Sequence, residues 1–165
     1  MKTAFIFGLG YVGMPLAHAL AKKGWQIRGT TRTPSKLNGK IGIGWEILPF
    51  VADSPLANPK KVFADVDVII STINAIGGRD PVLDLHGKDL ESFSGWAGYV
   101  SATSVYPDMP DNICYEDTPV APATARGKAR VLAERRWQNQ LGAEVFRAAG
   151  IYGPGRSPFD ALRDG

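Results

Sequence analysis

The sequence predicts an α/β domain built on a doubly wound parallel sheet, with helices on both faces. Two observations point to this fold class. Short apolar runs alternate with segments of helical periodicity from residue 3 to residue 148, and parallel neighbouring strands need a crossover that a helix usually supplies. Glycines and prolines also gather between these segments, where the chain must turn, and they form no low-complexity tract.

The first half of the chain is expected to begin with a buried strand. Residues 3–7 form a compact apolar run that ends at Gly8, which is typical of a strand buried on both faces. Residues 11–23 carry apolar side chains at helical spacing. Further strands are expected at residues 25–31, 46–51 and 65–71, with a short helix at best over residues 55–64.

The second half continues the alternation of helices and strands. A helix is expected over residues 80–93, because Pro81 suits the first helical turn. Another helix over residues 123–141 ends at Gly142. Strands are expected at residues 97–101 and 143–148. The 165 residues are enough for one domain with its own core, and we expect a single domain over residues 1–165.

Composition and charge exclude several classes of protein. An apolar fraction of 44% and a charged fraction of 21% exclude a disordered or collagen-like chain. The net charge of +3 is too small and too dispersed to predict a nucleic-acid partner. Cys114 is the single cysteine, and two separate histidines do not predict a metal site. The first apolar run is far shorter than the ~18 residues of a membrane span, so we expect a cytoplasmic protein with no membrane partner.

The segment Gly8-Leu9-Gly10-Tyr11-Val12-Gly13 fits the pattern G-x-G-x-x-G between a strand and a helix. In a Rossmann-type fold this position binds a dinucleotide: Gly8 allows the turn, Gly10 lets the backbone approach a pyrophosphate, and Gly13 permits close packing of the helix. The helix amino terminus attracts the phosphates. We therefore predict that the loop binds the cofactor through Gly8, Gly10, Tyr11, Val12 and Gly13. A plain strand-to-helix turn is the alternative.

The end of the second expected strand discriminates between NAD and NADP. An acidic residue about 20 residues after the motif would bind the adenosine ribose and favour NAD. Residues 29–36 contain no acid, and Arg32 instead presents a fork that suits a 2′-phosphate, with Thr31 as a hydroxyl donor. NADP is therefore the expected cofactor and NAD the alternative. Arg32 as an ordinary solvated arginine remains the other interpretation.

Residues after the next strands are further candidates for cofactor binding. Asp53 suits a hydrogen bond from the adenine amino group, although a helix-capping role explains it equally well. Asn74 and Ala75 follow the strand at residues 65–71, and ligands of parallel sheets lie at the carboxyl ends of the strands. We therefore expect both to lie beside the cofactor.

The sequence resembles the short-chain dehydrogenase/reductase superfamily, in an atypical subgroup of its extended branch of NAD(P)-dependent epimerases and dehydratases. The segments that carry the resemblance are GLGYVG at 8–13, YVSATSVY at 99–106, EDTP at 116–119 and RAAGIYGPGR at 147–156. The resemblance implies that Ser101 and Ile151 belong to the cofactor site. It also implies a separate substrate-binding part, of which residues 150–165 would be the truncated start.

Family members use a Tyr-x-x-x-Lys pair, in which tyrosine is the acid/base and lysine holds the nicotinamide ribose. Lys128 lies in the matching helix, but the residue four positions earlier is Thr124, and the chain contains no Tyr-x-x-x-Lys. At the position where family members carry an orienting serine or threonine hydroxyl, this sequence has Ala102. As catalytic candidates this leaves Lys128, Thr103, Ser104 and Tyr106. Lys128 is interpreted equally well as a ribose ligand or as one basic residue of a solvated face.

Two functions of different classes follow. The first is an NADP-preferring oxidoreductase or epimerase-like activity on a small hydroxylated or sugar-nucleotide substrate. The second is a non-catalytic dinucleotide-binding or sensing module, because the catalytic pair is absent; a nonfunctional fragment is a third interpretation. The expected partner is a small-molecule substrate, and a homodimer stays open.

Overall fold

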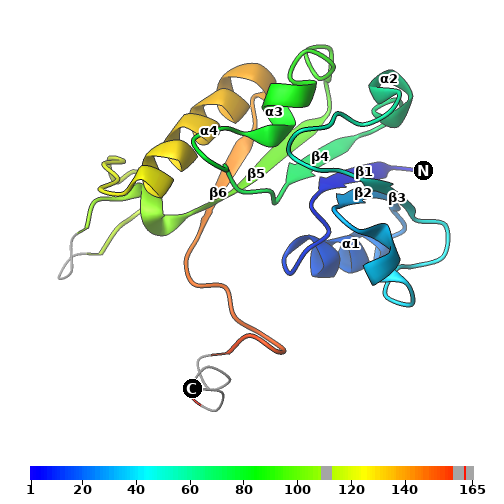
Figure 1. Cartoon of the computed structure of the whole chain (residues 1–165), viewed down its shortest axis with the longest axis horizontal. Coiled ribbons are helices and arrows are strands. Elements are labelled where there is room, and N and C mark those ends of the chain that lie inside the picture. The colour runs from blue at the N-terminus through cyan, green and yellow to red at the C-terminus, as the bar shows by residue number, and fades with distance from the viewer. Residues whose placement is uncertain (109–112, 158–161, 163–165) are drawn as a thin grey trace.

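The computed structural model describes residues 1–108, 113–157 and 162. Its centre is a six-stranded sheet in which every pair of neighbours is parallel, in the order β3-β2-β1-β4-β5-β6 (Figure 1). The chain builds the sheet outward from β1 to β3 and then returns to add β4 on the other side of β1. The strands are β1 (Thr3–Phe7), β2 (Gln26–Thr31), β3 (Glu46–Pro49), β4 (Val68–Ser71), β5 (Trp96–Ala102) and β6 (Glu144–Ala148).

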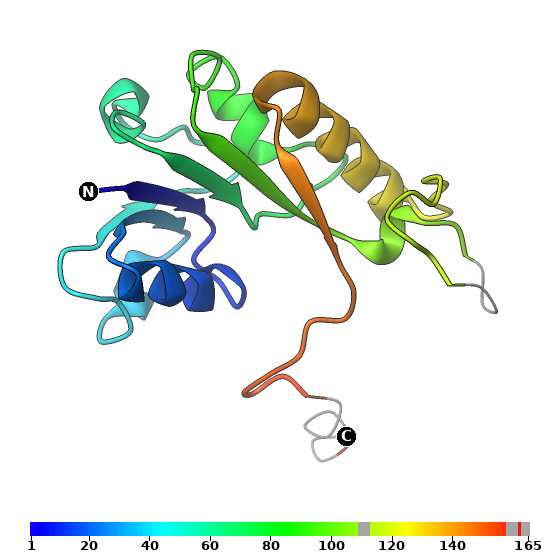
Figure 2. The ribbon, with the colours of Figure 1, turned by 180° about the vertical axis from the view of Figure 1, so that it is seen from behind.

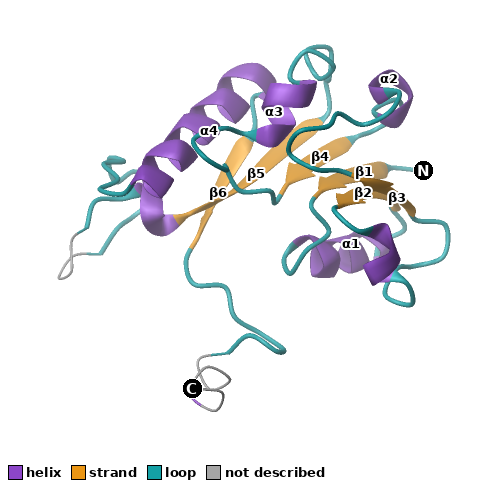
Figure 3. Ribbon diagram, viewed as in Figure 1, coloured by secondary structure: helices purple, strands orange, loops and turns teal. Residues whose placement is uncertain are grey.

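Helices cover both faces of this sheet, so the predicted fold class is confirmed. Helix α1 lies on one face, and α2, α3 and α4 lie on the other (Figure 3). The view from behind shows the same layers (Figure 2). The α-helices are α1 (Gly13–Lys22), α2 (Pro59–Val62), α3 (Pro81–His86) and α4 (Ala125–Leu141), and the short 3₁₀ turns are η1 (Pro34–Leu37) and η2 (Thr103–Val105).

Strand β1 is the centre of the core, as its apolar run predicts. Ala4 and Ile6 pack in the cluster beneath α1, whereas Phe5 and Phe7 pack in the cluster beneath the opposite helices. All four side chains are fully buried. The alternation of side chains along a strand explains why a continuous apolar run supplies both clusters. The carboxyl end of β1 is therefore a rigid support for the loop that follows it.

Several elements are shorter than predicted, and α3 and β4 show why. Helix α3 ends at His86 instead of residue 93, and the residues that follow form turns in which the buried His86 ring pairs with Asp89 (Nδ1 to Oδ2, 2.9 Å). Strand β4 begins at Val68 instead of residue 65, because Asp65 has a left-handed backbone (φ +54°) that no strand adopts. Neither difference changes the order of the strands.

Beyond β6, residues 149–157 leave the sheet (Figures 1 and 2). This segment contains a turn in which Gly153 and Arg156 exchange backbone hydrogen bonds of 2.9 Å. The rest of the expected start of a substrate-binding part, residues 158–161 and 163–165, lies outside the described residues. In the part of the chain that the structure describes, no helix combines the length and apolarity that crossing a membrane requires.

Candidate functional site

The glycine loop between β1 and α1 is held by hydroxyl groups on both sides. Gly8, with a left-handed φ of +91°, donates its N–H to Oγ1 of Thr30 at 2.9 Å, and Leu9 N–H donates to the Thr30 carbonyl at 2.7 Å. The hydroxyl of Thr72, the residue that follows β4, donates to the Gly8 carbonyl at 2.7 Å. The loop is thus fixed between β2 and β4. Sequence reasoning did not identify Thr30 and Thr72 as residues that hold the loop. The only indication in the sequence was that each is a hydroxyl residue near the end of a strand.

Gly13 and Gly10 are needed for different physical reasons. A Cβ at Gly13 would collide with the carbonyl oxygen of Gly8, so the predicted close packing of the helix on the loop is confirmed. A Cβ at Gly10 would meet no heavy atom within 4 Å. The space in front of Gly10 is therefore open, as the approach of a ligand to the backbone requires.

A cavity of about 510 Å³ lies on the β2 side of the loop. Predicted cofactor residues that line it are Gly8, Gly10, Thr31, Arg32 and Asn74. Arg32 is exposed, and within residues 1–108, 113–157 and 162 its side chain has no hydrogen bond or ion pair. Its guanidinium is thus available to a ligand in this cavity.

A second cavity, of about 330 Å³, lies on the β5 side of the loop. Predicted residues that line it are Gly10, Tyr11, Val12, Asn74, Ser101 and Ile151. Because Gly10 and Asn74 line both cavities, the two adjoin and form one cleft along the carboxyl edge of the sheet. We call the parts the Arg32 half and the Arg130 half of the cleft. The Arg130 half is also lined by Arg126, Arg130 and Arg156, which the sequence analysis did not select.

Arg130 is the buried basic residue of the cleft. Its side chain donates from Nη2 to Oδ1 of Asn74 at 2.9 Å, and the residue is only 4% exposed. Burial lowers the pKa of Arg130, but an arginine that starts from so high a pKa keeps its charge at neutral pH. The Arg130 half of the cleft is therefore positively charged.

Lys128 is exposed and does not line either half of the cleft. Arg126 and Arg130 lie one turn apart on the face of α4 that meets the cleft, and Lys128 is displaced from each by about 200° around the helix axis. Thr124 is the N-cap of α4, with Oγ1 accepting from Gly127 N–H at 3.0 Å. The solvated basic face that is the alternative interpretation of Lys128 includes Arg126 and Arg130, and for Arg130 this interpretation is wrong, because the residue is only 4% exposed.

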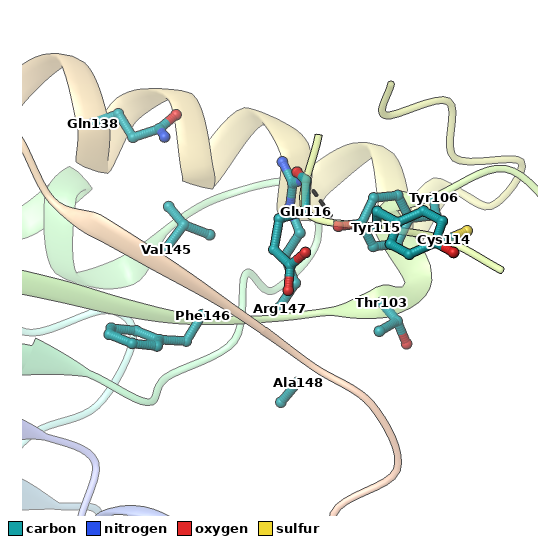
Figure 4. A pocket seen from close by; sticks show the side chains of 10 residues that line it. All are labelled: Thr103, Tyr106, Cys114, Tyr115, Glu116, Gln138, Val145, Phe146, Arg147 and Ala148. Atoms are coloured by element: carbon teal, nitrogen blue, oxygen red, sulfur yellow. Dashed lines mark hydrogen bonds between the residues drawn. The ribbon is translucent and has the colours of Figure 1, made fainter. Parts of the chain in front are cut away.

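The other catalytic candidates do not line the cleft. Thr103 and Tyr106 line another hollow of about 540 Å³ beside β6 (Figure 4), which shares Ala148 with the Arg130 half of the cleft. There the Tyr106 hydroxyl accepts a hydrogen bond of 3.2 Å from Arg147, which also pairs with Glu134 at 2.9 Å. Ser104 is exposed and lines neither the hollow nor the cleft. No residue of the glycine loop lines this hollow, so we take the cleft as the functional site.

Asp53 and Ala75, like Lys128 and Gly13, are predicted cofactor residues that line neither half of the cleft. Asp53 is exposed in the turn between Val51 and Ser54, and its neighbours Val51 and Ala52 line the Arg32 half instead. The capping interpretation of Asp53 is wrong, because α2 begins at Pro59 with Asn58 as its N-cap. Ala75 is partly buried and packs against the main core cluster.

The strand order, the glycine loop and the cleft together define a class of protein. The loop follows β1, where the direction in which strands are added reverses, and ligands of such sheets bind outside the carboxyl ends of the strands at this point. The chain is a Rossmann-type NAD-binding domain. Residues 2–93 match the family described as the NAD binding domain of 6-phosphogluconate dehydrogenase, and the chain belongs to this family.

Relatives and solved structures are similar to almost the whole chain. Protein YeeZ of Escherichia coli (strain K12) is 33% identical over 175 residues, which cover 96% of this chain and 62% of YeeZ. A functionally unknown conserved protein from Silicibacter pomeroyi DSS superposes with a TM-score of 0.84 and 36% identity, over 100% of this chain and 58% of that one. The chain thus spans less than two thirds of either protein.

An enzyme of known activity shares the fold. UDP-glucuronic acid 4-epimerase from Bacillus cereus, solved in complex with NAD, superposes with a TM-score of 0.75 at 18% identity. The match covers 96% of this chain and 60% of the epimerase.

Proposed function

We propose that the cleft binds NADP(H) in preference to NAD(H). The observation that carries this proposal is Arg32, an exposed guanidinium without a protein partner among the described residues, which lines the half of the cleft next to β2. Because that half lies beyond the end of β2, it suits the adenosine ribose, and Arg32 suits its 2′-phosphate. Gly10, open to solvent at the junction of the two halves, suits the pyrophosphate.

We further propose that the whole protein is an oxidoreductase or epimerase-like enzyme of the extended short-chain dehydrogenase/reductase type. Hydride transfer would be the chemistry of the bound cofactor, and the protein would bind and orient it. A small hydroxylated or sugar-nucleotide substrate fits the resemblance and the shared fold with UDP-glucuronic acid 4-epimerase. In this proposal a substrate-binding part begins at about residue 150, since YeeZ is longer than the chain.

A second function, non-catalytic dinucleotide binding, is favoured by one specific observation. The side chains that α4 presents to the cleft are Arg126 and Arg130, and arginine does not act as a general acid or base at neutral pH. Tyr11 is the phenol that lines this half, and the Arg156 guanidinium lies 5.3 Å from its ring centre. If Tyr11 does not transfer protons, the domain binds its cofactor without turnover.

Calorimetric titration of the protein with NADPH and with NADH tests the proposal. We expect saturable binding of both cofactors, with NADPH the tighter. Failure of both to bind would overturn the assignment of the cleft, and equal affinities would overturn the preference for NADP. Turnover of NADPH with a panel of carbonyl and sugar-nucleotide substrates then separates the two functions: tight binding without turnover supports the non-catalytic module.

A further inference from the structure

The Arg130 half of the cleft carries more positive charge than an uncharged nicotinamide needs. Arg126, Arg130 and Arg156 all line this cavity of about 330 Å³. Among the described residues that line it, none is acidic. The protein as a whole has a net charge of only +3, so this concentration of basic groups at one end of the cleft is a local feature.

The position of these arginines is unfavourable for the fold itself. Arg126 is in the first turn of α4, where the partial positive charge of the helix terminus repels a cation, and this turn contains no acidic residue. Arg130 lies one turn later and is 4% exposed, so its charge is taken out of water. The nearby carboxylate of Glu134 is paired with Arg147 at 2.9 Å. An anion in the cavity would compensate both arginines.

Two buried polar atoms in this half of the cleft lack a hydrogen-bond partner in the part of the chain that the structure describes. They are Nε of Arg130 and Oγ of Ser101. Ser101 is 2% exposed and lines the same cavity as the arginines. Buried polar groups almost always have partners, and both atoms donate to oxygen. The chemistry of this set is therefore that of a receptor for an oxyanion.

We propose that the Arg130 half of the cleft contains a subsite for a carboxylate or phosphate group of the substrate, formed by Arg126, Arg130 and Ser101. Arginine binds both groups through paired hydrogen bonds, which suits either anion. The proposal rests on the proposed function, in which Gly10 and Arg32 already account for the phosphates of the cofactor. Arg156, held over the ring of Tyr11 at 5.3 Å, adds positive charge to the same cavity.

The test uses the full chain saturated with NADPH and titrated calorimetrically with inorganic phosphate and, separately, with malonate at constant ionic strength. We expect saturable binding of at least one anion, and the tighter of the two identifies the preferred group. Arg126→Gln should weaken that binding roughly tenfold or more, because a hydrogen bond to a charged group is lost. Arg126 is exposed, so this variant should fold. Arg135→Gln, exposed on the same helix and outside the cavity, is the matched control and should bind normally.

Three results would overturn the proposal. They are the absence of saturable anion binding, equal anion affinity in Arg126→Gln and the native protein, and competition between the anion and NADPH. Competition would mean that the arginines hold a phosphate of the cofactor. If NADPH does not bind but an anion binds to the free protein and depends on Arg126, the proposed function fails and the anion subsite stands.

Discussion

Nη2 of Arg130 lies 2.9 Å from Oδ1 of Asn74, and both residues line the Arg130 half of the cleft. Arg130 belongs to α4, and Asn74 belongs to the loop that follows β4. Asn74 lines both halves of the cleft. The bond therefore links α4 to a residue at the junction of the two halves, and it supplies the buried guanidinium with an acceptor.

Replacing Asn74 by alanine tests how much this acceptor contributes to the free energy of unfolding. The substitution leaves the buried Arg130 charge without its side-chain acceptor, and we expect a loss of about 1.5–3 kcal/mol in the free energy of unfolding. Urea unfolding of the native protein and of Asn74→Ala measures it. Asn139→Ala, at an exposed position of α4, is the matched control and should be close to neutral. Equal stability of Asn74→Ala and the native protein would contradict the role of the bond.

Alanine at Gly13 should reduce the stability of the protein, whereas alanine at Gly10 should reduce its affinity for NADPH. Gly13→Ala places a methyl group against the Gly8 carbonyl, so we expect a loss of about 1–3 kcal/mol in unfolding free energy. Gly10→Ala points into open space, so its stability should be unchanged, but the methyl group would occupy the approach of the pyrophosphate and weaken NADPH binding. Thermal unfolding and NADPH titration of both variants separate the effects. If Gly10→Ala binds NADPH normally, the pyrophosphate does not lie against Gly10.

Arg32→Ala should reduce the preference for NADPH over NADH. Loss of a charge-assisted contact to the 2′-phosphate costs about 1.5–3 kcal/mol, which is roughly a tenfold or greater loss in NADPH affinity. NADH affinity should not change, because NADH lacks that phosphate. Titration of each variant with both cofactors gives the ratio, with Arg135→Ala as the control. An unchanged ratio in Arg32→Ala would show that the 2′-phosphate assignment is wrong.

Asp80 should make the free energy of unfolding depend on pH. Burial raises the pKa of Asp80 above its ordinary value of 3.8, and hydrogen bonds from Leu83 N–H and the Trp137 indole oppose the shift. At a pH between the unfolded pKa of Asp80 and its raised folded pKa, the folded protein binds more protons than the unfolded chain. The contribution of Asp80 is thus full below its unfolded pKa and is lost as the pH rises through its folded pKa. The stability advantage of the native protein over Asp80→Asn should shrink as the pH rises.

Urea unfolding between about pH 3.5 and about pH 7 measures this difference. Asp84→Asn is the control of opposite sign. Burial alone would raise the pKa of Asp84, but the bonds and charges of Arg136 and Arg79 outweigh it and lower that pKa. The contribution of Asp84 is present above its unfolded pKa and is lost as the pH falls. A stability difference for Asp80→Asn that is constant or grows with pH would refute the assignment.

Tyr106→Phe should leave cofactor binding intact. The Tyr106 hydroxyl bonds to Arg147 in the hollow beside β6, away from the glycine loop. Removing it deletes one hydrogen bond, so we expect a loss of about 1 kcal/mol in unfolding free energy and an unchanged affinity for NADPH. Calorimetric titration and urea unfolding of the same preparation check both. A large loss of NADPH affinity in Tyr106→Phe would contradict this and would show that Tyr106 contributes to cofactor binding.

The sequence by itself determined the class of fold and the position of the glycine loop between β1 and α1. Both follow from local chemistry: the apolar run of β1 demands burial on two sides, and Gly8 and Gly13 occupy positions where a side chain is strained or excluded. The position of Arg32 was also predicted from the sequence, because Arg32 directly follows the end of β2 at Thr31. We expected Asn74, Ser101 and Ile151 to lie near one another beside the cofactor, and all three line the Arg130 half of the cleft.

Only the tertiary structure decided which face of α4 meets the cleft. The buried side chains of this helix include charged residues, Arg130 and Glu134, beside apolar ones such as Trp137. Hydropathy therefore does not reveal the packed face, and Lys128 was selected in place of the two arginines. Helical spacing shows which residues share a face, but the partners that bond to a buried charged side chain, here Asn74 for Arg130 and Arg147 for Glu134, come from distant segments. Because those partners exist only once the sheet has formed, the chemistry of the Arg130 half of the cleft is a property of the folded chain.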